Sequence, residues 1–159
     1  MKEFNYNGTD SILKIPHGDK VWGVVVPCNT NAKYPIKIFD NEMRVFCRNN
    51  HLDEKLSRYS KEYGIHVFYL GTFKNVNGTL VKFFSFPIKE NAKDLLNATV
   101  VMNSCTDLVG MCERYGVDVC ILPQLQDKDD FIAWVNCYRD MTNLILDNKF
   151  VMVYRIPQK

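Results

Sequence analysis

The segment Val21-Trp22-Gly23-Val24-Val25-Val26-Pro27-Cys28-Asn29 is the strongest indication of the fold class of this chain. From Val21 to Val26 the run is almost continuously apolar, which is typical of a strand that helices bury on both faces. A strand with one face in water would instead alternate apolar and polar residues. The run then breaks into a polar loop at Pro27. We therefore interpret it as a central strand of an α/β sheet.

Further strands and amphipathic helices alternate on either side of this run. Short β-rich runs predict strands at 4–6, 12–15, 65–70, 80–86, 117–122 and 150–154. Apolar residues at steps of three and four predict helices at 35–49, 52–63, 99–115 and 131–145. This alternation predicts an α/β fold, a three-layer α/β/α sandwich around a mixed, mostly parallel sheet.

Local turn and cap residues set several of these boundaries. Asn77-Gly78 lies between two strand-like runs and predicts a tight hairpin there. The helix over 52–63 is expected to begin behind a cap at Asn50 or Asp53 and to end at Gly64, since glycine readily closes a helix in the left-handed conformation.

Composition places the chain among ordinary soluble domains. Its 159 residues are 47% hydrophobic and 24% charged, so we expect one domain over 1–159. Twenty basic and eighteen acidic side chains give a net charge of +2, too small an excess to indicate nucleic acid or an anionic membrane as partner. No apolar stretch approaches the ~20 residues of a membrane span, and no signal peptide precedes the domain, so a cytoplasmic protein is expected.

The six cysteines show no C-x-x-C pair and no zinc-site spacing. Several fall on apolar faces of predicted helices and strands, where a thiol behaves as a small hydrophobe. We expect reduced core residues, and neither a metal nor a cofactor.

Two strand-to-loop junctions are the candidate binding site. The first is Val25-Val26-Pro27-Cys28-Asn29-Thr30-Asn31, and the second is Ile121-Leu122-Pro123-Gln124-Leu125-Gln126. If both strands are parallel, both junctions open at one edge of the sheet, where loop amides and helix amino ends suit a phosphate. The alternative is that both are plain connections without a ligand.

The order of elements and several motifs together resemble the macro domain family. Phe84-Ser85-Phe86-Pro87-Ile88-Lys89 is similar to the family's N-F-P-T-K type strand end, and Pro123-Gln124-Leu125 with Ile132-Ala133-Trp134-Val135 is similar to its P-x-L and L-x-W-x-x-V elements. Val24-Val25-Val26-Pro27-Cys28-Asn29 resembles the I-V-N-x-x-N strand. The resemblance implies binding of ADP-ribose or another NAD-derived nucleotide and, in some branches, its hydrolysis.

The resemblance also implies a set of ligand-binding residues. Asn29 matches the second asparagine of the first motif and is suited to orienting a ribose. Gly18-Asp19-Lys20 resembles the family's adenine-reading turn, with Asp10 as the competing position. The full predicted set is Asp19, Cys28, Asn29, Thr30, Asn31, Lys33, Gln124, Leu125, Gln126, Lys128 and Phe131. No catalytic residue is assigned.

The chain departs from the family at its phosphate loops. Where the family has glycines, this chain has Gln126-Asp127-Lys128-Asp129-Asp130-Phe131, with three carboxylates. Two like charges about 4 Å apart repel by ~4 kcal/mol at an effective dielectric near 20. Two alternatives therefore stay open. Either the chain binds a nucleotide in altered form, with ADP-ribosyl or phosphoester hydrolysis as the accompanying reaction, or it is a non-catalytic, virus- or phage-type protein that binds a protein partner or sequesters a nucleotide signal.

Overall fold

The structure is a computed structural model, and it describes residues 2–7, 21–29, 45, 47–64, 66–74, 78–90, 94, 97–123 and 150–156. Two full helices lie within these ranges, α2 (Leu52–Tyr63) and α3 (Ala98–Arg114). The described strands are β1 (Lys2–Asn7), β2 (Trp22–Asn29), β3 (Tyr69–Lys74), β4 (Leu80–Lys89), β5 (Val119–Pro123) and β6 (Phe150–Ile156).

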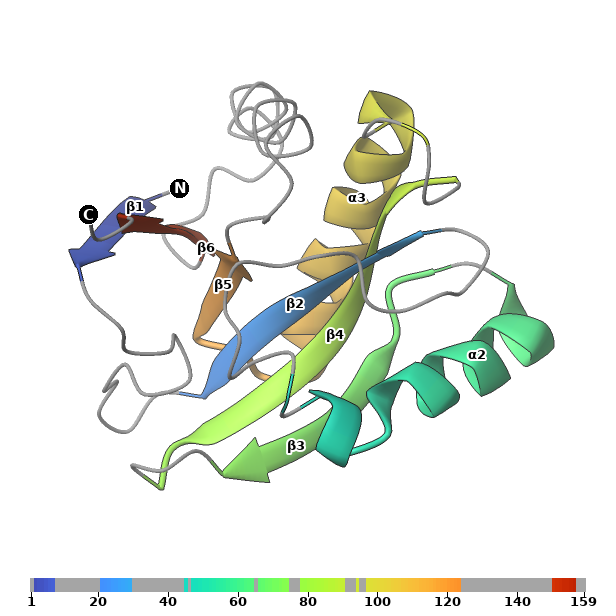
Figure 1. Cartoon of the computed structure of the whole chain (residues 1–159), viewed down its shortest axis with the longest axis horizontal. Coiled ribbons are helices and arrows are strands. Elements are labelled where there is room, and N and C mark those ends of the chain that lie inside the picture. The colour runs from blue at the N-terminus through green and yellow to red at the C-terminus, as the bar shows by residue number, and fades with distance from the viewer. Residues whose placement is uncertain are drawn as a thin grey trace.

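The strands form one mixed sheet in the order β1-β6-β5-β2-β4-β3 (Figure 1). All neighbouring strands are parallel except β3 and β4, which form an antiparallel pair. The predicted mixed, mostly parallel sheet is therefore confirmed. β2 lies inside the sheet between β4 and β5, and residues 23–28 are buried, as the apolar run indicated.

The two helices cover opposite faces of the sheet. On one face, Phe83 of β4 contacts Phe73 edge to face at 5.7 Å, and Nζ of Lys55 on α2 lies 5.6 Å from the Phe73 ring centre. On the other face, the next residue, Phe84, contacts Tyr115, which directly follows α3. Figure 1 shows α3 passing behind β2 and β4. Successive side chains of a strand point to opposite faces, so the three-layer arrangement follows.

The hairpin between β3 and β4 is confirmed, but its first strand begins later than predicted. β3 starts at Tyr69 rather than at residue 65. The Ser85 hydroxyl accepts the Phe68 N–H at 2.8 Å and donates to the His66 carbonyl at 3.2 Å. A side chain of β4 therefore satisfies the backbone groups that a regular ladder would otherwise pair.

The helix boundaries agree closely with the sequence pattern. The Asn97 side chain caps α3 by accepting the Val100 N–H at 3.1 Å. The predicted end of α2 at Gly64 is confirmed, but with φ of 80° and ψ of −168° the glycine is not in the left-handed helical conformation that was expected. The expected cap of α2 at Asn50 or Asp53 is wrong, because His51 occupies the N-cap position with φ of 55° and no side-chain cap bond. Asp53 instead lies in the first turn, where its charge favours the helix dipole.

Several predicted elements lie outside the described residues. These are the strand at 12–15, the helix at 131–145 and, apart from Val45 and residues 47–49, the helix at 35–49. The described cysteines are all free and buried, which confirms their interpretation as core residues. In the described part of the chain, no helix is long and apolar enough to cross a membrane, and no three metal-ligating side chains gather.

Candidate functional site

The carboxyl ends of β2 and β5 meet at one edge of the sheet. The strands are adjacent and parallel, with Trp22 opposite Val119 and Val24 opposite Ile121. The strand that follows β2 in the chain is β3, which lies on the β4 side of β2 in the sheet. The strand that follows β5 is β6, which lies on the other side, away from β2. Connections that leave in opposite directions create a crevice at the strand ends, where ligands of open α/β sheets bind. The two predicted junctions therefore begin at one switch point.

The ladder between β2 and β5 is short on the side of this crevice. It ends at the pair Val24 and Ile121, whereas the ladder between β2 and β4 continues to the pair Asn29 and Lys89. Within the described residues, the last part of β2 therefore pairs with β4 but not with β5. Backbone N–H and C=O groups of such a segment are the kind that meet a bound ligand.

Lys89 is the functional candidate at this edge that reasoning from sequence missed. It is the last residue of β4, and only 5% of its surface is exposed. It pairs in register with Asn29, across an irregularity between Cys28 and Asn29. Buried lysines are rare because an ammonium loses hydration, so the burial of Lys89 at this strand end makes it a candidate for contact with an anionic ligand. The sequence did contain a signal for Lys89: it is the last residue of the segment Phe84–Lys89, which resembles the family's N-F-P-T-K type strand end.

Cys28 lies in the core, and its thiol is not an activated nucleophile. The residue is 1% exposed. Burial raises the pKa of the Cys28 thiol to about 12, and a hydrogen bond with the backbone of Phe86 only partly opposes that effect. The thiol is therefore protonated at neutral pH. That Cys28 contacts a ligand stays a prediction. Such a contact would involve its backbone rather than its buried sulfur.

The other predicted ligand residues have side chains outside the described part of the structure. For Asn29 the structure places the backbone at the end of β2. Roles for the remaining positions stay predictions: Asp19, Thr30, Asn31, Lys33, Gln124, Leu125, Gln126, Lys128 and Phe131.

Solved structures with the same architecture identify the fold. The macrodomain of Mycobacterium tuberculosis DarG matches with a TM-score of 0.63 and 12% identity, over 98% of this chain and 99% of that one. This chain has the macrodomain fold. The macrodomain of Thermus aquaticus DarG matches with a TM-score of 0.61 and 16% identity, again over 98% and 99% of the two chains.

A third similar structure is a complex with a ligand. Thermosipho africanus DarTG in complex with ADP-ribose matches with a TM-score of 0.58 and 14% identity, over 86% of this chain and 38% of that one. Neither a protein-family profile nor a curated protein sequence matches this chain. The macrodomain likeness therefore lies in the fold, and this sequence is a divergent one.

Proposed function

We propose that this macrodomain binds ADP-ribose or another NAD-derived nucleotide at the carboxyl ends of β2 and β5. The observation that carries the proposal is the switch point between these two strands, to which both predicted junctions connect. The similar structure of Thermosipho africanus DarTG in complex with ADP-ribose supports the choice of ligand.

Lys89 supplies a positive charge at an edge whose loops lack the glycines of the family. In the resembling family, backbone amides of glycine-rich loops approach the phosphates closely. Here the buried Lys89 ends β4, and its backbone pairs with Asn29 at the end of β2. One positive charge at this edge offsets repulsion of a diphosphate by the carboxylates of Asp127, Asp129 and Asp130. Asn29 orients the ribose, because an amide offers both a donor and an acceptor.

Binding is the core of the proposal, and hydrolysis is its extension. An ADP-ribosyl or phosphoester bond held at this edge would be cleaved by water rather than by Cys28, whose thiol is protonated. The free thiols of the described cysteines are what a reducing compartment maintains, so we place the activity in the cytoplasm.

Calorimetric titration with ADP-ribose tests the proposal. Lys89→Met keeps the length of the side chain and removes its charge, and removal of a charge-assisted hydrogen bond weakens binding about tenfold or more. Lys61→Met, on the exposed end of α2, is the matched control and binds like the wild type. Asn29→Ala, which alters no charge, also weakens binding.

Two results would contradict the proposal. One is the absence of heat with millimolar ADP-ribose. The other is equal affinity of Lys89→Met, Asn29→Ala and Lys61→Met. A further experiment replaces Asp127 and Asp130 by glycine. If their carboxylates repel the diphosphate, the affinity for ADP-ribose rises, and an unchanged affinity would show that they do not repel it. Release of free ADP-ribose from an ADP-ribosylated substrate measures the hydrolytic extension.

A further inference from the structure

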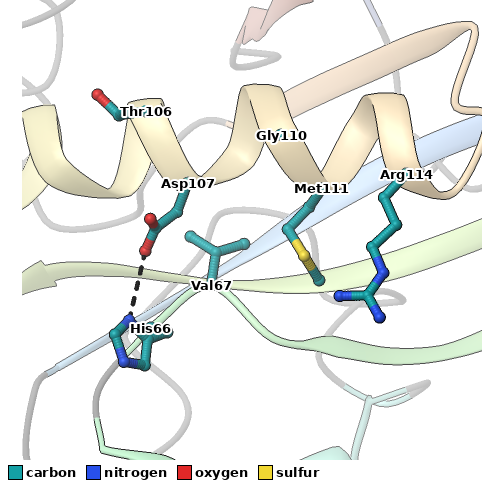
Figure 2. Close-up of a pocket in the computed structure, with 7 residues that line it drawn as sticks. All are labelled: His66, Val67, Thr106, Asp107, Gly110, Met111 and Arg114. Carbon is teal, nitrogen blue, oxygen red and sulfur yellow. Dashed lines mark ion pairs between the residues drawn. The ribbon is translucent and has the colours of Figure 1, made fainter.

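A second concave surface lies between α3 and the segment before β3. It is an open depression with a volume of about 420 Å³. Figure 2 shows the side chains of Asp107, Met111 and Arg114 extending from α3 toward His66 and Val67. We call this surface the α3 groove, and its lining consists of His66, Val67, Thr106, Asp107, Gly110, Met111 and Arg114.

The α3 groove is separate from the nucleotide edge. α3 begins at the carboxyl end of β4, where the Asn97 N–H donates to the Ile88 carbonyl at 2.8 Å. After α3 the chain reaches the start of β2, where the Asp118 N–H donates to the Val21 carbonyl at 2.9 Å. The groove residues of α3 run from its midpoint at Thr106 to its end at Arg114, so a ligand there lies away from Lys89.

Opposite charges lie at the two ends of the α3 groove. At one end, Nδ1 of His66 is 3.7 Å from Oδ2 of Asp107, and both side chains are about half exposed. At the other end lies Arg114. Asp107 and Arg114 are seven residues apart on one face of α3, which is about 10 Å along a helix axis. Met111 and Val67 form an apolar stretch between the two charged ends.

Gly110 leaves the middle of the α3 groove open. A glycine inside a helix costs about 1 kcal/mol relative to alanine. A Cβ at Gly110 would meet nothing within 4 Å, so no packing inside the described structure requires the glycine. The glycine therefore leaves the helix backbone accessible from the open side.

The Arg114 end is a site for an anion and does not suit the stacking of a nucleic-acid base. Cζ of Arg114 and Nζ of Lys82 lie 5.8 Å and 5.5 Å from the centre of the Tyr115 ring. Tyr115 also stacks on Tyr69 with centroids 4.4 Å apart. The ring faces are thus occupied, whereas the two cations retain donors for an acceptor. Asp107 at the other end would repel a continuous polyanion.

We propose that the α3 groove binds an extended segment of a partner protein in which a basic and an acidic residue lie three positions apart. Three residues of extended chain span about 10 Å, which matches the separation of Asp107 and Arg114. The basic residue pairs with Asp107, the acidic residue with Arg114, and the two intervening side chains pack on Met111 and Val67. The flexible thioether of Met111 adapts to different apolar side chains.

An NMR titration of the full ¹⁵N-labelled chain with the capped tetrapeptide Lys-Val-Leu-Glu tests this proposal. Shifts are expected at residues 66–67 and 106–114, and substituting glutamine for the peptide's glutamate weakens binding. Arg114→Gln weakens binding about tenfold, as for other charge-assisted pairs. Arg58→Gln is the matched control, because Arg58 on α2 also lies over a tyrosine, 5.2 Å from the Tyr59 ring centre, and it binds like the wild type.

Gly110→Ala separates binding from folding. Its methyl group enters the open groove, so peptide affinity falls while the melting temperature stays equal or rises. Lys89→Met leaves peptide binding unchanged, which keeps this test independent of the nucleotide proposal. The proposal is overturned if no shifts arise at millimolar peptide, if Gly110→Ala binds like the wild type, if Arg114→Gln equals Arg58→Gln, or if a thymidine hexanucleotide displaces the peptide.

Discussion

At the scale of a residue, the buried thiol of Cys28 makes the stability of the protein depend on pH. Its pKa is raised by burial to about 12 from an ordinary value of 9.0. As the pH rises past 9.0, the unfolded thiol ionises while the folded thiol stays protonated, so unfolding releases a proton and stability falls. Between pH 8 and pH 10 this one group lowers the unfolding free energy of the wild type by about 1.4 kcal/mol.

Cys28→Ala lacks the titrating thiol and therefore isolates this effect. The variant is less stable than the wild type at pH 8, because it leaves a cavity in the core. The stability gap, measured by urea denaturation, is expected to narrow by about 1.4 kcal/mol on going to pH 10. Lysine and tyrosine titrations are common to both proteins and cancel in the difference. A gap that is the same at both pH values would contradict the prediction.

At the scale of an element, Asn97 fixes where α3 begins. Its side-chain oxygen accepts the Val100 N–H at 3.1 Å, while its own N–H joins the helix to Ile88 of β4. Asn97→Ala removes only the side-chain bond and is expected to lower the unfolding free energy by about 1 kcal/mol, measured by urea denaturation. Asn97→Asp keeps an acceptor and stays close to the wild type. Equal stabilities of the alanine and aspartate variants would show that the cap contributes nothing.

At the scale of the whole molecule, Gly23 marks where β2, β4, β5 and the chain after α3 come together. A Cβ there would lie 3.0 Å from Cγ1 of Val117 and 3.3 Å from both Sγ of Cys120 and Cε2 of Phe84. Gly23→Ala forces these neighbours apart and is expected to cost about 1–3 kcal/mol in urea denaturation. Gly110→Ala adds the same methyl group in open space and costs nothing. Similar losses in both variants would contradict this packing.

Helices and strands could be predicted where neighbours in the sequence decide them. The pattern over 99–115 placed α3 to within one residue at each end, because its apolar stripe and the glycine that follows it, Gly116, are local signals. The start of β3 could not be predicted in this way. It depends on the Ser85 hydroxyl, 17 residues further along the chain from Phe68.

The candidate site shows the same division. Both strand-to-loop junctions were recognised from the sequence, since an apolar run that breaks into polar residues is a local pattern. Lys89 was missed as a candidate, because its burial and its register with Asn29 exist only once β2 and β4 are paired. A lysine in a sequence is most often exposed.

For the described residues, the types of element, their order and the burial of β2 follow from the order of residues, because side-chain periodicity and turn chemistry act between near neighbours. The strand order, and with it the position of the site, arises only when distant parts of the chain meet. The Val21 N–H donates to the Asp118 carboxylate at 2.8 Å although the two residues are 97 positions apart. Such contacts form because apolar strands must be covered on both faces, and no local pattern specifies which distant strand pairs with which.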